Sequence, residues 1–167
     1  MFFRITKVSD HLTIKHKILE LIDKFEVDYH ITKDEKIAKT DWGMEIEKPY
    51  LQHLDRLINE DMVNTYKELG GTGISLNNIW FHQYRQNDYY NWHNHKETNF
   101  TNIYYLEFPK TAPVTEFLDP DTGQVIKVDV YEGCVLTVPG FILHRSPPSN
   151  SDRKTVIVFN AELDYQI

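Results

Sequence analysis

The stretch GISLNNIWFHQYRQNDYYNWHNHKETNFTNIYYLEF, residues 73–108, decides the fold class. It is rich in β-branched and aromatic residues, which favour strands, and polar residues divide it into short runs. We predict strands over Leu76–Tyr84, Tyr89–His95 and Phe100–Phe108, with a turn at residues 86–88. Short strands that follow one another without intervening helices indicate an antiparallel β fold.

The same pattern continues toward the end of the chain. Val114–Leu118 and Val125–Tyr131 are predicted strands joined by the turn DPDTG at 119–123, and strands are predicted again at Cys134–Val138 and Lys154–Asn160. Such a succession predicts a mainly β protein with flanking helices, of the double-stranded β-helix (jelly-roll) class.

The first part of the chain has helical periodicity instead. Apolar residues at helical spacing predict one helix within 14–25 and a second from Pro49 to Leu69, which is followed by Gly70-Gly71. The polar segment 28–48 has no clear pattern, and Trp42 within it is expected to be a packing residue.

The length suits one domain. We expect a single domain over residues 1–167, in which residues 1–72 form a helical N-terminal support and residues 73–167 form the jelly-roll core.

Composition and charge narrow the class of protein. The chain is 41% hydrophobic and 26% charged, typical of a globular protein, and its net charge of −7 argues against nucleic-acid binding. The single cysteine, Cys134, allows no intrachain disulfide, which favours a cytoplasmic setting. No apolar run approaches the ~20 residues of a membrane helix, and the first residues lack a signal-peptide pattern. The oligomeric state leaves no mark on the sequence.

Two histidines separated by one residue are the sharpest chemical feature. In a strand, His93 and His95 would project from the same face, and imidazole binds iron, zinc, copper and nickel. His144 follows 51 residues after His93 and could join them from a partner strand, which would give a three-nitrogen metal site. The alternatives are two surface histidines and a His144 that packs beside Pro147-Pro148.

Arg153 is a candidate anion-binding residue. It comes nine residues after His144 and could enter the last strand facing the same cavity, where its guanidinium could hold a carboxylate by a bidentate fork. The alternative is a surface arginine beside Asp152.

Three tyrosines are further candidates. Tyr84 has the same strand parity as His82 and lies upstream of the histidine pair. Tyr104 and Tyr105 are adjacent, so only one of them should face the cavity.

Taken in order, these residues resemble the iron(II)/2-oxoglutarate-dependent oxygenases, most closely their prolyl-hydroxylase-like branch. The resemblance covers about residues 76–160, half of the chain. Its pieces are WHNH at 92–95, TNIYYL at 101–106, the segment 133–139, HRSPP at 144–148, Arg153, and Phe159-Asn160.

The resemblance implies an iron(II) centre that uses molecular oxygen and 2-oxoglutarate, which becomes succinate and carbon dioxide, to hydroxylate a small-molecule or peptidyl substrate. It implies that His93 and His144 bind the metal and that Arg153 holds the far carboxylate of 2-oxoglutarate. Tyr84 and Tyr105 would contact the same co-substrate.

One position departs from the family pattern. The usual second ligand is Asp or Glu, and here it is His95. A pairing of His95 with Glu97 would restore a carboxylate and is the alternative register. With three histidines, the centre carries one negative charge fewer than usual.

Two other functions compete with this one. The segment from Gly133 to His144 also fits loosely a cupin motif, which would give a three-histidine metal dioxygenase that uses no 2-oxoglutarate. Arg153 discriminates, because only the 2-oxoglutarate hypothesis needs it. The second alternative is a non-enzymatic jelly-roll module that binds a sugar or a protein on its aromatic face.

Overall fold

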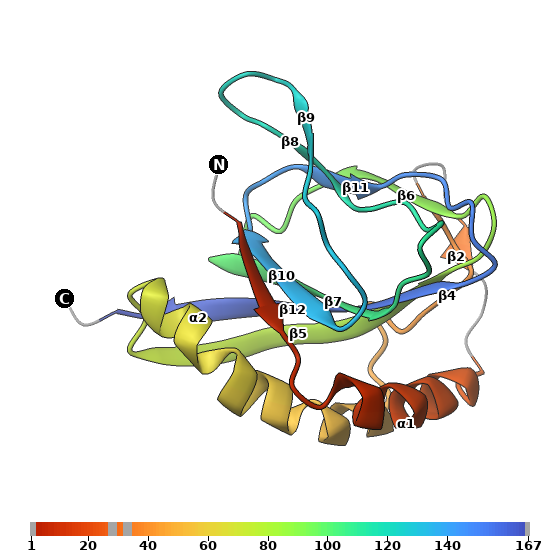
Figure 1. Ribbon diagram of the computed structural model, residues 1–167, viewed down its shortest axis with the longest axis horizontal. Helices are drawn as coiled ribbons and strands as arrows, with labels where there is room; N and C mark the ends of the chain where they lie inside the picture. Colours follow the sequence, from red (N-terminus) through yellow and green to blue (C-terminus); the bar gives the residue numbers. More distant parts are fainter. Residues whose placement is uncertain (1–2, 27–29, 32–34, 166–167) are drawn as a thin grey trace.

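The computed structural model of the chain describes residues 3–26, 30–31 and 35–165. Within them, two six-stranded antiparallel sheets face each other, with helices packed outside (Figure 1). The first sheet consists, in spatial order, of β1 (Arg4–Lys7), β10 (Cys134–Pro139), β7 (Phe100–Glu107), β12 (Lys154–Asp164), β5 (Gly73–Tyr84) and β4 (Lys39–Thr40). The second consists of β2 (His30–Ile31), β3 (Glu35–Ile37), β6 (Tyr89–His93), β11 (His144–Ser146), β8 (Glu116–Leu118) and β9 (Val125–Lys127). The predicted jelly-roll class is confirmed.

Helical segments cover the outer face of the first sheet (Figure 1). They are α1 (His11–Asp23), the 3₁₀ helix η1 (Pro49–His53), the π-helical turn η2 (Leu57–Asp61) and α2 (Val63–Glu68). The second predicted helix therefore begins at Pro49 as expected, but three helical geometries divide it. In the described part of the chain, no helix has the length and apolar character needed to cross a membrane.

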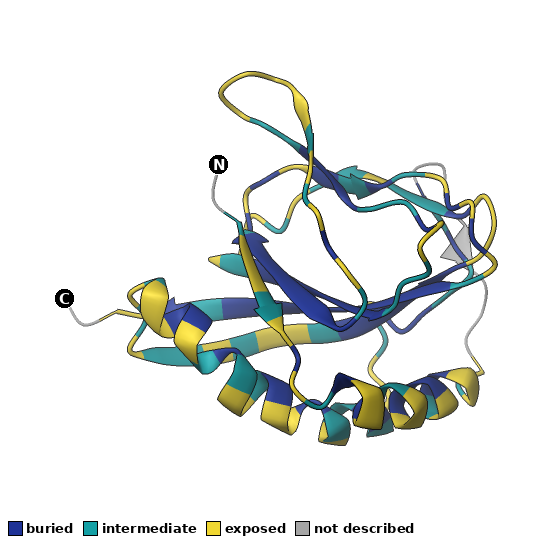
Figure 2. Ribbon diagram, in the orientation of Figure 1, coloured by how far each residue is buried: buried dark blue, intermediate teal, exposed yellow. Residues whose placement is uncertain are grey.

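Strand β12 separates two hydrophobic cores, because both of its faces are buried (Figure 2). Ile157 and Phe159 point outward and pack in one core with Ile18 of α1. Val156 and Val158 point inward, between the sheets, and pack in the other core. The inward face of β12 therefore forms one wall of the space in which the functional residues lie.

The structure changes the bounds of several predicted strands: β5 and β12 are longer than predicted, and β6 and β9 are shorter. Strand β11 was not predicted, because three residues beside a Pro-rich loop carry too little pattern for a strand assignment. Strand β9 ends at Lys127 rather than at Tyr131. Part of the unassigned segment 28–48 lies outside the described residues; its described part supplies β2, β3 and β4.

Candidate metal centre

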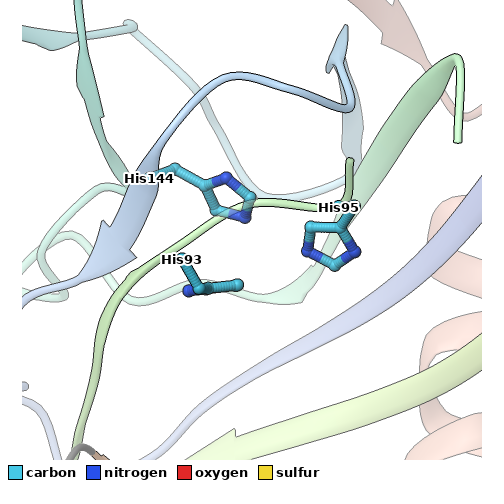
Figure 3. Close-up of side chains that lie close together, drawn as sticks. All are labelled: His93, His95 and His144. Carbon is cyan, nitrogen blue, oxygen red and sulfur yellow. The ribbon is translucent and has the colours of Figure 1, made fainter. Parts of the chain in front are cut away.

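Three histidines come together between the sheets. Strands β6 and β11 pair so that His93 lies opposite His144, with ring centroids 4.3 Å apart. The His95 ring lies 5.3 Å from that of His93 and 5.2 Å from that of His144. One ligand nitrogen from each ring lies within 4.8 Å of the other two, and the rings surround a common space (Figure 3). This set of side chains can hold one metal ion.

His95 reaches the cluster by a different route from the predicted one. Strand β6 ends at His93, so His95 does not follow it as the next inward residue of a strand. The backbone N–H of His95 instead donates to the Gly140 carbonyl (2.7 Å), and the Gly140 N–H donates to the Asn99 carbonyl (2.9 Å). A Cβ atom at Gly140 would clash with the backbone oxygens of His95 and Thr98. Glycine therefore allows the loop at residues 94–99 to lie against the turn after β10.

The ring nitrogens are arranged as metal ligands require. Nδ1 of His93 lies 2.8 Å from the Asn91 carbonyl, and Nδ1 of His144 lies 3.0 Å from the Ile142 carbonyl. A ring that donates from Nδ1 keeps its Nε2 lone pair for a metal. Nε2 of His95 is buried and has no hydrogen-bond partner among the described residues. A buried ring nitrogen without a hydrogen-bond partner is consistent with a role as metal ligand.

Burial also keeps the three rings neutral. It lowers the pKa of His93, and it lowers the pKa of His95 to about 4 with a contribution from the neighbouring His93. The pKa of His144 lies well below its ordinary value, chiefly because of burial and further because of the other two rings. Neutral imidazole is the form that binds a metal.

A buried lysine lies in the same cavity as the histidines. Lys154, the first residue of β12, is only 1% exposed. Together with His93 and His144 it lines a small cavity between the sheets, which we call the inner cavity. Its Nζ donates to the Pro113 carbonyl (3.1 Å) and to Oγ of Ser146 (2.9 Å). No salt bridge to a carboxylate forms among the described residues, and burial lowers the pKa of the amine to about 7. A buried amine without a counter-ion favours an anionic ligand.

Arg153 lies outside this cavity, contrary to the prediction. Its Nε and Nη2 donate to the two carboxylate oxygens of Glu107 (2.6 and 2.8 Å), and it forms an ion pair with Asp23. Successive residues of an extended chain point to opposite sides, so the side chains of Arg153 and Lys154 diverge. The structure thus brings Lys154, and not Arg153, to the histidines.

Proteins similar to this chain are found by structure and not by sequence. No protein-family profile and no curated protein matches the sequence. Among solved structures, the chain is similar to the α-ketoglutarate-dependent epimerase SnoN from nogalamycin biosynthesis (TM-score 0.72, 12% identity, covering 96% of this chain and 78% of that one). It is similar to a Pseudomonas putida prolyl-4-hydroxylase (0.63, 13%, 97% and 92%). It also resembles a Trichoplax adhaerens prolyl hydroxylase in complex with a hypoxia-inducible-factor peptide (0.64, 17%, 95% and 82%).

The chain has the fold of the iron(II)/2-oxoglutarate-dependent oxygenases. The resemblance seen in the sequence is therefore confirmed at the level of the fold. In this oxygenase fold, the histidine cluster and the buried lysine occupy the space between the two sheets.

Two of the predicted tyrosines face this space. Tyr84 lines the inner cavity directly opposite Lys154 in the β5–β12 register, and Nζ of Lys154 lies 5.0 Å from its ring centroid. Tyr105 points inward, and its hydroxyl is 2.9 Å from Oγ1 of Thr115, which lines the cavity. Tyr104 points to the helical layer and contacts His11 (2.7 Å). Burial raises the pKa of Tyr84 and of Tyr105, so both hydroxyls stay neutral.

A second, outer cavity adjoins the first. It has a volume of about 370 Å³ and shares His93 and His95 with the inner cavity. Glu97, the alternative second ligand, is exposed in its wall and is not a member of the histidine cluster. Trp42 also lines this cavity and is 49% exposed, so the expectation that it is a packing residue is wrong.

Proposed function

We propose that the chain is an iron(II)- and 2-oxoglutarate-dependent oxygenase that hydroxylates its substrate. The observation that carries the proposal is that three neutral histidines and one buried lysine without a carboxylate partner share a cavity within this fold. A metal centre and a carboxylate-binding group are the two parts that such an enzyme needs.

In this proposal, His93, His95 and His144 hold iron(II), and the bound iron supplies the activation of molecular oxygen with 2-oxoglutarate as co-substrate. Lys154 takes the role expected of Arg153 and pairs with the far carboxylate of 2-oxoglutarate. Tyr84, opposite Lys154, offers a neutral hydroxyl at the same end of the cavity.

The cavity walls suit a reaction that must exclude water. Ile103, Val156 and Val158 give the inner cavity, which Lys154 also lines, a partly apolar wall. The free volume of the inner cavity is about 30 Å³, so entry of 2-oxoglutarate requires neighbouring side chains to move. The Lys154 amine, which is bonded to Pro113 and Ser146, would exchange these partners for the carboxylate.

The test is iron-dependent conversion of 2-oxoglutarate to succinate in air, followed by NMR. We expect slow conversion even without the primary substrate, and we expect His144→Ala to reduce it at least about a hundredfold, because loss of a metal ligand removes the centre. His16→Ala is the matched control, since His16 is exposed on α1. Equal activity of the His144→Ala protein would refute the assignment.

A three-histidine dioxygenase that uses no 2-oxoglutarate is the second candidate. The observation in its favour is the neutral ligand set, which lacks the usual carboxylate. An enzyme of this second kind would bind iron(II) tightly, and 2-oxoglutarate would have no effect on the bound metal. The buried Lys154 then has no ligand to pair with, which is why we prefer the first proposal.

A further inference from the structure

The outer cavity has a polar wall with only two charged side chains among the residues that line it. Besides His93 and His95 of the metal centre, and Trp80, His82 and Tyr90, which also line the inner cavity, its wall consists mainly of neutral hydrogen-bonding side chains and a second tryptophan. These residues are Trp42, Asn77, Asn78, Asn94, Thr98 and Asn160. The charged residues of the wall, Lys96 and Glu97, are of opposite sign and both exposed. The cavity therefore favours a neutral ligand with many hydrogen-bonding groups.

The residue before Trp42 is anchored in the fold, whereas half of the Trp42 surface is exposed. The preceding residue, Asp41, is fully buried. Its carboxylate accepts hydrogen bonds from the Phe81 N–H (2.8 Å) and the Tyr50 hydroxyl (2.6 Å), and it forms an ion pair with Lys48 (3.2 Å). The exposed part of a large aromatic ring at a cavity can stack on the apolar face of a ligand.

The asparagines reach the cavity from three separate segments. Asn78 comes from β5, Asn94 from the loop after β6, and Asn160 from β12. A side-chain amide has both donors and an acceptor. Nδ2 of Asn94 donates to the Phe141 carbonyl (3.5 Å) and Oδ1 of Asn160 accepts from Oγ1 of Thr101 (3.1 Å), which leaves these two amides part of their capacity for a ligand. Groups of this kind arranged around a cavity suit a compact ligand whose hydroxyl groups point in several directions.

An extended peptide fits this place less well. A peptide that adds to a sheet needs free backbone groups along a strand edge. From residue 79 onward, the edge of β5 is already occupied: the Ile79 carbonyl accepts from Lys48 (2.8 Å), and the Phe81 carbonyl accepts from Oγ1 of Thr40 (2.8 Å). The next residues of β5 pair with β4. No strand can be added there without displacing these contacts.

We infer that the outer cavity binds a neutral saccharide unit. The C–H face of the sugar ring stacks on Trp42, its hydroxyl groups bond the asparagine amides, and one edge of the ring faces His93 and His95. The assignment of this sugar as the oxidised substrate rests on the proposed function, whereas its binding does not.

The test measures binding without turnover. The protein is loaded with zinc, which is redox-inactive, and is screened by ligand-detected NMR against neutral methyl glycosides and disaccharides and against acetylated, amidated tripeptides. We expect saturable binding of glycosides and none of the peptides. Trp42→Ala should weaken glycoside binding at least about tenfold, and Trp42→Phe should retain most of it because a ring remains. Asn78→Ala should weaken it about threefold or more, as expected for one hydrogen bond.

Tyr131→Ala is the matched control, since Tyr131 is 48% exposed and lies at a different cavity. Its glycoside affinity should equal that of the unchanged protein. Peptide binding that depends on Trp42, glycoside binding that Trp42→Ala leaves intact, or no glycoside binding at all would each overturn the inference. If the proposed function is wrong, no succinate forms in the iron-dependent test described above, whereas glycoside binding to the zinc-loaded protein is measured independently of it.

Discussion

At the scale of single residues, the charge of one amine controls the proposed co-substrate site. Burial lowers the pKa of Lys154 to about 7. Above pH 7 the folded, ligand-free protein holds this amine neutral, so binding of a carboxylate must also take up a proton. The dissociation constant for 2-oxoglutarate should therefore rise by up to about tenfold per pH unit above pH 7. Calorimetric titrations between pH 6 and 8.5 measure this dependence.

Lys154→Arg is the control for that dependence, because arginine keeps its charge throughout this range. Its affinity for 2-oxoglutarate should change little with pH. His144 and Tyr84 of the same cavity do not add to this dependence, because the pKa of His144 is lowered and that of Tyr84 is raised. A flat pH profile in the unchanged protein, or the same slope in Lys154→Arg, would show that Lys154 is not the group that titrates.

At the scale of elements, the turn after β10 positions the loop that carries His95. Gly140→Ala should push the backbone of residues 94–99 away, because a Cβ at this position clashes with the oxygens of His95 and Thr98. We expect iron(II) affinity to fall about 10–100-fold, as when other supporting groups of metal ligands are lost. Competition with a chelating dye measures it. Phe141→Ala, at the next and 62% exposed position, should leave the affinity unchanged; equal losses in both variants would argue against a specific role for Gly140.

The helical layer supports the first sheet without touching the site. Ile18 of α1 is fully buried against the outer face, which includes Ile157 and Phe159 of β12. Ile18→Ala should lower the free energy of unfolding by about 2–5 kcal/mol and leave the affinity for iron(II) unchanged at a temperature where the protein is folded. Leu12→Ala, on the same helix but 79% exposed, should cost little. Urea titrations compare the two, and equal effects would contradict the packing described here.

At the scale of the whole molecule, the sequence predicts the fold class well and the site only in part. The strands from β5 onward have clear patterns and turn residues, and His93 and His144 come together because β6 and β11 pair. We predicted that Arg153 faces the cavity and did not consider Lys154; this was wrong because β12 is buried on both faces and its sequence shows no alternation. Trp42 was misjudged because its exposure depends on the contacts of Asp41 with β5.

The most direct test of the proposed function compares two adjacent residues of β12. Iron(II)-loaded protein is titrated with 2-oxoglutarate without oxygen, and the visible charge-transfer band of the chelate is followed. We predict that Lys154→Met raises the dissociation constant at least about tenfold, because it removes a charge-assisted hydrogen bond. Arg153→Met, which breaks only the pair with Glu107 and Asp23, should leave the constant within about twofold. Loss of the band in Arg153→Met with full affinity in Lys154→Met, or no band in any protein, would contradict the account.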